Sequence, residues 1–184
     1  FSQGQTSDDP YFQFVADMGY GWGGDKIYEG RWDVYEENYY TGHYHYEGSE
    51  RFTIRAGEGA LFRIGGILAL PAIPLEIMTT AGYMVASESG EDDDYTFDRK
   101  VIDVVGYYPL GMNRFGAGFT FHLSPSFEYH DGWWDETINF KDATGLLLEY
   151  GLHADWARFY VRAQWLDYEA EDFDWKVSAN SVAL

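Results

Sequence analysis

Apolar and polar residues alternate along most of the chain with a period of two. The clearest example is the segment 157–165. Its apolar face includes Phe159 and Val161, and its polar face includes Arg158 and Arg162. Such alternation is typical of β-strands that have one face in an apolar environment. The pattern predicts eight strands, at about residues 12–22, 60–71, 75–87, 99–110, 115–124, 146–153, 157–165 and 178–184.

The connections between these strands alternate in length. Three are short, namely 72–74, 111–114 and 154–156. Four are long and polar, namely 24–59, 88–98, 128–142 and 167–177. Together these four connections hold most of the 31 acidic residues. Short periplasmic turns and long extracellular loops are the pattern of outer-membrane β-barrels. We therefore expect an antiparallel up-and-down arrangement with the negative charge gathered at one rim.

The apolar face of the strands is large and almost free of charge. A water-soluble barrel shows the same alternation but turns its apolar face inward. The size of the apolar face here and its lack of charge indicate a barrel with lipid outside. Aromatic residues lie near both edges of the face, as expected at headgroup level. They are Tyr20, Trp22, Phe127, Tyr129 and Trp165 at the outer interface, and Phe12, Tyr108 and Trp156 at the inner one. The fold predicted is an all-β, eight-stranded antiparallel transmembrane β-barrel of a bacterial outer membrane.

The opposite face is polar and charged. An eight-stranded barrel has room only for its own side chains, and an unpaired charge inside would cost several kcal/mol. We therefore expect the lumen charges to form a paired network. Its predicted members are Asp17, Arg63, Glu76, Asp103, His122, Glu149, His153, Arg158 and Arg162. Small inward residues such as Gly19, Gly65 and Gly116 leave room for water, so a small low-conductance pore is an alternative function.

The amino-acid composition argues against several classes of protein and of site. The net charge of −19 argues against nucleic acid as a partner. Acidic chains are often disordered, but 46% hydrophobic and 20% aromatic residues argue against disorder here. The chain has no cysteine, so neither a disulfide framework nor a thiolate metal site is expected. No segment approaches the roughly 18 uninterrupted apolar residues of a spanning helix.

The two ends of the sequence suggest a mature or trimmed form. Residues 1–9 show no signal peptide and are expected to be an N-terminal periplasmic segment. Residues 10–184 are expected to form a single β-barrel domain. In the last strand only Val182 and Leu184 can face lipid, whereas a crossing takes about 9–11 residues. The expectation is that this strand is truncated.

Two stretches resemble the OmpA-like outer-membrane β-barrel superfamily. They are RFGAGFTFHLSPSFEY and DATGLLLEYGLHADWARFYVRAQWLDYEA, and the resemblance in pattern extends over residues 10–184. The resemblance implies an eight-stranded barrel of a Gram-negative outer membrane, with membrane lipids and lipopolysaccharide as neighbours. Members usually end in an aromatic residue, whereas this sequence ends Val182-Ala183-Leu184. Many members have no assigned activity, so the resemblance implies a fold and a location far more than a function.

The sharpest catalytic alternative is His122 and Ser124, followed by Glu128. Outer-membrane lipid A deacylases are similar in fold and use His, Ser and an acidic residue for hydrolysis. The catalytic side chains of these deacylases must face lipid, where the acyl chains of the substrate lie. The alternation here puts Phe121 and Leu123 on the lipid face and turns His122 and Ser124 into the lumen. We expect a structural role for these residues and no enzymatic activity.

Metal binding is a weaker alternative, and no cofactor is expected. His43 and His45 could share one face of a strand and bind a transition metal, although a solvated hairpin fits the same residues. Divalent cations could bind at the acidic loops, through the run of Asp92, Asp93 and Asp94. That run lacks the spacing of an EF-hand, so a charged surface is favoured.

Aromatic residues among the acidic loops indicate an extracellular or membrane protein partner. They are Tyr39, Tyr40, Trp133, Trp134, Phe140, Phe173 and Trp175. These residues could equally pack on one another to order the loops. The predicted function is a structural or surface-interaction role, in which the chain could be a subunit of a larger surface assembly.

Overall fold

The structure is a computed structural model that describes residues 11–38, 43–70, 73–89, 93–131, 134–154 and 157–184. All regular structure in these residues is β-strand. No helix among them is long and apolar enough to cross a membrane. The strands are β1 (Tyr11–Gly23), β2 (Lys26–Asn38), β3 (His43–Arg55), β4 (Gly59–Leu70), β5 (Leu75–Ser89), β6 (Asp93–Leu110), β7 (Asn113–Asp131), β8 (Trp134–Asn139), β9 (Ala143–Ala154), β10 (Ala157–Trp165), β11 (Asp167–Glu169), β12 (Lys176–Ser178) and β13 (Ser181–Ala183).

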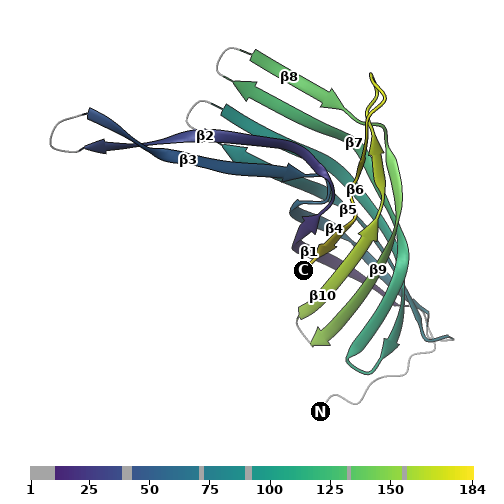
Figure 1. Cartoon of the computed structure of the whole chain (residues 1–184). Coiled ribbons are helices and arrows are strands. Elements are labelled where there is room, and N and C mark those ends of the chain that lie inside the picture. The colour runs from purple at the N-terminus through teal and green to yellow at the C-terminus, as the bar shows by residue number, and fades with distance from the viewer. Residues whose placement is uncertain (1–10, 39–42, 71–72, 90–92, 132–133, 155–156) are drawn as a thin grey trace.

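Eight of these strands form one closed antiparallel ring. Its hydrogen-bonded order is β6–β5–β4–β1–β13–β10–β9–β7, and β7 pairs again with β6 (Figure 1). The predicted strand 157–165 coincides with β10, and each of the other seven predicted segments overlaps one strand of the ring. The expected eight strands and their antiparallel pairing are thus confirmed.

The four segments expected to be long loops contain further strands, and that part of the prediction was wrong. Segment 24–59 holds the hairpin of β2 and β3, and segment 167–177 holds the paired strands β11 and β12. β6 begins as early as Asp93, and β7 continues to Asp131, where β8 pairs with it. These strand segments, which we call the strand extensions, lie at the end of the ring opposite the short turns (Figure 1). They were missed because backbone pairing needs only a partner strand and no long apolar run.

A β-bulge in β7 reverses which of its side chains point inward. Ser124 has φ 47°, and the register with β6 shifts by one residue at this point. An extra residue in one strand moves the alternation by one position. Before the bulge Phe119 is exposed, and after it Phe127 is only 4% exposed. The prediction that Phe127 and Tyr129 face outward was therefore wrong, because both pack in the interior.

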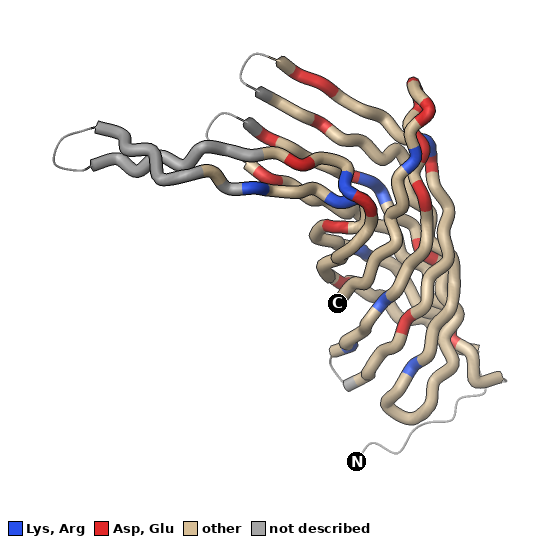
Figure 2. The backbone as a smooth tube through the Cα atoms, in the orientation of Figure 1, with Lys and Arg blue, Asp and Glu red and all other residues tan. Residues whose placement is uncertain are grey.

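The outer wall of the ring is apolar. Its exposed side chains include Phe14, Met18, Phe62, Ile64, Leu68, Phe115, Phe119, Leu146, Leu148, Leu152, Phe159 and Val161. Apart from Phe127 and Tyr129, the described aromatic residues predicted at the interfaces are exposed as well, namely Phe12, Tyr20, Trp22, Tyr108 and Trp165. Trp156 lies outside the described residues. Acidic positions gather on the strand extensions (Figure 2).

An aromatic cluster fills the interior at the end opposite the short turns. This upper cluster comprises Phe52, Ile54, Tyr95, Phe97, Phe127, Phe140, Leu166, Tyr168 and Val177 with smaller neighbours. Tyr28 on β2 stacks on Tyr95 with ring centroids 4.5 Å apart, and Tyr95 stacks on Tyr129 at 4.8 Å. Stacked aromatic rings stabilise a fold beyond the contribution of the apolar area that they bury. The cluster therefore attaches the β2–β3 hairpin to β6 and β7.

Candidate functional site

Charged side chains meet in the middle of the ring. Arg63 on β4 donates to both carboxylate oxygens of Asp17 on β1, with Nε–Oδ1 at 2.8 Å and Nη2–Oδ2 at 3.0 Å. Arg63 also pairs with Asp103 on β6 and donates to the Tyr160 hydroxyl on β10, 3.1 Å away. The side chains of Arg63 and Asp103 have no solvent exposure. One guanidinium thus joins four strands across the interior.

A second guanidinium completes this central network. Arg162 on β10 donates to Asp103 (Nη1–Oδ2, 2.7 Å) and to Glu149 on β9 (Nε–Oε1, 2.6 Å). The hydroxyl of Tyr107 donates to Glu149. Because each buried charge has an opposite charge beside it, the cost of removing these groups from water is largely offset. The central network is Asp17, Arg63, Asp103, Tyr107, Glu149, Tyr160 and Arg162.

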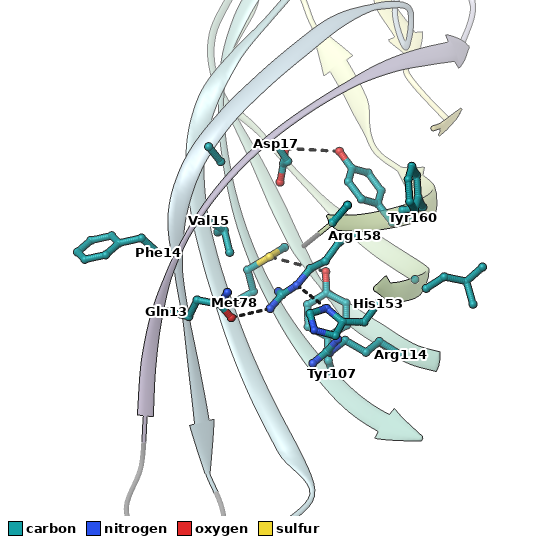
Figure 3. A pocket seen from close by; sticks show the side chains of 15 residues that line it. Gln13, Phe14, Val15, Asp17, Met78, Tyr107, Arg114, His153, Arg158 and Tyr160 are labelled. Carbon is teal, nitrogen blue, oxygen red and sulfur yellow. Dashed lines mark hydrogen bonds between the residues drawn. The ribbon is translucent and has the colours of Figure 1, made fainter. Parts of the chain in front are cut away.

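Three other predicted interior residues lie nearer the short turns. Glu76 accepts two hydrogen bonds from Arg114, at 2.7 and 2.9 Å. Arg158 donates to His153 at 3.2 Å and to Gln13 on β1 at 2.9 Å (Figure 3). The predicted network is therefore divided, with a central part and a part at the turn end.

His122 belongs to a third group, beside the upper cluster. Its Nδ1 shares a hydrogen bond with the Tyr168 hydroxyl, and both side chains are fully buried. The buried Arg99 donates to the carbonyl of Glu58 at 2.8 Å and lies over the Phe97 ring at 4.6 Å. His122 thus contacts aromatic residues and takes no part in the central ion pairs.

The three residues of the catalytic alternative are not brought together. His122 is buried and points inward, whereas Ser124 and Glu128 are exposed. The backbone N–H of Ser124 donates to the side chain of Asp142 at 2.8 Å. The bulge at Ser124 is the reason, because it turns the positions that follow it to the other face. A hydrolytic triad needs its members within hydrogen-bond reach, and the described contacts join none of these three.

The described residues contain no group of three or more His, Cys, Asp or Glu side chains that could hold a metal ion. The side chains of His43, His45, Asp92 and Asp93 lie outside the described set. In the backbone register, His43 faces Asn38 and His45 faces Glu36 within the β2–β3 hairpin. Asp94 is exposed. The structure therefore adds nothing that favours a metal at these positions.

The aromatic residues predicted to contact a partner differ in their surroundings. Trp134 on β8 is 75% exposed, and Phe173 is 49% exposed. Phe173 stacks on Trp175 with centroids 6.0 Å apart, and Trp175 packs against the buried Phe140. Tyr39, Tyr40 and Trp133 lie outside the described residues. Within the described part, Trp134 and Phe173 are the aromatic residues of this set that a partner could contact directly.

Sequence reasoning missed several interior side chains, among them Tyr107, Tyr160 and Arg114, which bind predicted residues, and Arg99, which binds the carbonyl of Glu58. Tyr107 and Tyr160 lie on the inward positions of strands whose Asp103 and Arg162 were selected, so their position in the alternation could have identified them. Arg114 was assigned to a turn, and Arg99 to the edge of a strand. Charge and polarity guided the selection, and tyrosine hydroxyls were overlooked for that reason.

Replacing Tyr168 by phenylalanine tests the hydrogen bond to His122. The change leaves the buried imidazole with one partner fewer, so we expect Tyr168→Phe to lower the free energy of unfolding by about 1–3 kcal/mol. Urea titration followed by Trp fluorescence measures it. The exposed Tyr108 provides the control, since Tyr108→Phe should change stability by less than about 0.5 kcal/mol. Equal effects of the two changes would contradict the buried bond.

Glu169 on β11 gives the extensions a dependence on pH. Hydrogen bonds from Lys141 and Lys176 lower the pKa of Glu169 from 4.5 to about 2. Because the folded pKa lies below the unfolded value, the stabilisation is complete above about pH 4.5 and is lost as pH falls through about 2. The side chains are exposed, so salt screens the effect.

We therefore expect Glu169→Gln to destabilise the chain slightly at neutral pH, with a difference that shrinks toward zero as the pH falls to about 2. Unfolding titrations at several pH values, in low and high salt, measure the difference. Glu171→Gln is the matched control, because Glu171 forms no ion pair within the described residues. A difference that is the same at every pH would contradict the pairing with the two lysines.

The fold and the interior define a class of protein: an all-β chain whose eight-stranded ring has an apolar outer wall and a charged interior. No protein-family model, no curated protein and no solved structure matches the chain.

Proposed function

We propose that the chain is a non-enzymatic β-barrel of a bacterial outer membrane, with a structural or surface-interaction role outside the cell. The observation that carries this proposal is the inverted arrangement of the ring. Ile64, in the middle of β4, is 70% exposed, whereas Arg63 beside it is 2% exposed. Water-soluble proteins rarely bury arginine and rarely expose so continuous an apolar wall. Lipid around the ring accounts for both features.

The outer wall changes character at one level, as a membrane boundary requires. On β6 the outward residues Val104 and Tyr108 are apolar or aromatic, whereas Thr96 and Asp98 are polar. On β7 the exposed Phe119 precedes the bulge and the exposed Glu128 follows it. Transmembrane barrels have an apolar band about 25 Å tall that ends at the interfaces. The strand extensions would then project into the extracellular space, with the short turns in the periplasm.

The filled interior favours a rigid support over a channel. The central network joins β1, β4, β6, β9 and β10, and the upper cluster packs against the end of the ring. Eight-stranded barrels are just wide enough for side chains to fill. We therefore propose that the ring anchors the extensions and conducts no steady ion current.

The extensions would be the part that meets a partner. Most of the acidic residues lie on them, and Trp134 and Phe173 are exposed there. Exposed aromatic side chains commonly anchor protein contacts. Anionic lipopolysaccharide would lie next to this acidic surface, so divalent cations between the two would reduce their repulsion.

Quenching of Trp fluorescence by brominated phospholipids tests the membrane location. In vesicles, we expect Trp22 and Trp165 at the edge of the outer wall to be quenched, so Trp22→Phe and Trp165→Phe should each lower the quenched fraction. Trp134→Phe is the matched control and should leave the quenched signal unchanged, because β8 lies beyond the bulge. A stable monomer without detergent, unquenched by these lipids, would reject the proposal.

Incubation with lipopolysaccharide tests the non-enzymatic part. We expect mass spectrometry to detect no release of fatty acid. Release by the original chain that disappears in His122→Ala would replace this proposal with a hydrolase.

A further inference from the structure

The sheet of the strand extensions ends at β8 (Figure 1). It consists of the end parts of β5, β6 and β7, followed by β8, and within the described residues β8 pairs with β7 alone. Phe140, which follows β8, donates its backbone N–H to the carbonyl of Pro125 on β7 at 2.9 Å. Backbone groups alternate in direction along an antiparallel strand. The even-numbered residues of β8 therefore bond to β7, and the N–H and C=O groups of the odd-numbered residues face away from it.

One end of this outward side of β8 is already paired. The carbonyl of Asn139 accepts a hydrogen bond from the backbone N–H of Glu171 at 3.0 Å. Residues 169–171 run antiparallel to the chain at this point. No backbone hydrogen bond among the described residues reaches the outward groups of Asp135 and Thr137. We call these N–H and C=O groups the β8 edge.

The side chains around the β8 edge are exposed, and two of them are acidic. The four residues from Trp134 to Thr137 are all exposed, Trp134 to 75%. Asp135 pairs with His130 on β7, whereas none of the ion pairs found in the described part of the chain includes Glu136. Glu136 and Trp134 share one face of the strand, because side chains alternate along it. A cation beside Glu136 would thus have a carboxylate and an indole ring within reach, and both attract it.

Charge determines which kind of chain can add to the β8 edge. The chain has a net charge of −19, and acidic positions gather on the strand extensions (Figure 2). Pairing of two copies through this edge would bring the carboxylates of Asp135 and Glu136 close to those of the second copy. Charged side chains on an edge strand resist such self-pairing. A basic extended segment has the complementary charge, and adding a strand to an open sheet edge is a common mode of peptide recognition.

We propose that the β8 edge binds an extended segment of a partner protein that contains lysine or arginine, as a fifth strand antiparallel to β8. The residue opposite Glu136 would form a non-hydrogen-bonded pair, in which the Cα atoms lie about 4.5 Å apart and the side chains are closest. A lysine there pairs with Glu136 and lies against Trp134. Its two neighbours exchange backbone hydrogen bonds with Asp135 and Thr137. This partner class deepens the proposed surface-interaction role of the extensions and rests on it.

Disulfide cross-linking to a Thr137→Cys variant tests the proposal, because the chain has no cysteine of its own. A five-residue peptide with lysine at positions one, three and five, cysteine at position two and threonine at position four is added to the full chain in detergent micelles. In the proposed pairing its cysteine lies opposite position 137, at a Cα separation of about 5.5 Å that a disulfide can span. We expect a cross-link with Thr137→Cys and none above background with Thr96→Cys. Thr96 is the matched control, because it lies in the same row of the sheet but on β6, between two paired strands.

Two methylated peptides separate strand pairing from attraction between charges. One carries an N-methyl group on its threonine, whose N–H would point to Asp135. The other carries it on its central lysine, whose N–H would point away from β8. Both keep every charge, so we expect the first change to lower the cross-link yield about tenfold and the second to change it by less than about twofold. Equal yields from the two peptides would overturn the proposal.

Glu136→Gln, added to Thr137→Cys, tests the preference for a basic segment. We expect the cross-link yield to fall about threefold, because one exposed ion pair is lost. Glu88→Gln is the matched control and should leave the yield unchanged, since Glu88 is exposed in the same row but on β5, at the other side of the sheet. Equal losses from the two changes would mean unspecific attraction of charge and would contradict the assigned partner class.

Disulfide-linked pairs of the Thr137→Cys chain as the main product would likewise overturn the proposal, in favour of a second copy at the β8 edge. Quenching by brominated lipids tests the membrane location without any peptide. A chain that is quenched but forms no cross-link would therefore refute the strand addition and leave the membrane location standing, so the two failures are distinguishable.

Discussion

Replacing Arg63 by methionine destabilises the folded chain by about 3–5 kcal/mol, the expected cost of removing one partner from a buried ion pair. The change leaves the carboxylate of Asp103, which has no solvent exposure, with Arg162 as its remaining cationic partner. It also removes both hydrogen bonds to Asp17. Urea unfolding in lipid vesicles or micelles, followed by Trp fluorescence, measures the loss.

Two controls separate the ion pair from the loss of packing. Arg63→Met combined with Asp103→Asn should recover part of the loss, because a buried charge is removed with its partner. Lys26→Met removes the exposed pair with Glu29, whose atoms are 2.6 Å apart, and should cost less than about 1 kcal/mol. A loss at Arg63 no larger than that at Lys26 would mean that the interior is hydrated.

Replacing Ile64 by arginine destabilises the chain by about 2–4 kcal/mol in a lipid bilayer, the cost measured for a cation at mid-membrane on the outside of a barrel. Ile64 lies midway along β4 and is 70% exposed. In water, the same change at so exposed a position would alter stability by less than about 0.5 kcal/mol. The size of the effect therefore reports what surrounds the outer wall.

Trp134→Arg is the matched control for this substitution. Trp134 is 75% exposed but lies on β8, beyond the bulge in β7. We expect it to change the free energy of unfolding by less than about 0.5 kcal/mol. An equally small effect at Ile64 would show that water covers the outer wall, and the proposed location would then be wrong.

The ring strands were predictable because a period of two survives wherever one face is apolar. β10 shows this best, with Phe159 and Val161 exposed and Arg162 buried, as the sequence pattern required. The extensions were not predictable in the same way. In β2 and β3 the inward residues include the aromatic Tyr28 and Phe52 among charged neighbours, and their partners lie far away in sequence. The alternation within one segment gives no information about contacts with residues that are distant in sequence.

The interior was predicted in its composition and less well in its contacts. Alternation placed Asp17, Arg63 and Asp103 on one face, and they do meet. Alternation could not predict how far along the axis of the ring each side chain lies, because that position depends on the register between neighbouring strands. For that reason His122, expected among the ion pairs, lies instead beside Tyr168.

The bulge at Ser124 has a consequence for how the extensions can vary in length. Beyond it, Phe127 is enclosed and Glu128 is exposed, whereas an uninterrupted β7 would have exchanged the two. Inserting or deleting one residue between Ser124 and Phe127 would repeat that exchange and put a carboxylate among packed rings. Changes by two residues would preserve the facing. Viable length variants of this arm should therefore differ by even numbers.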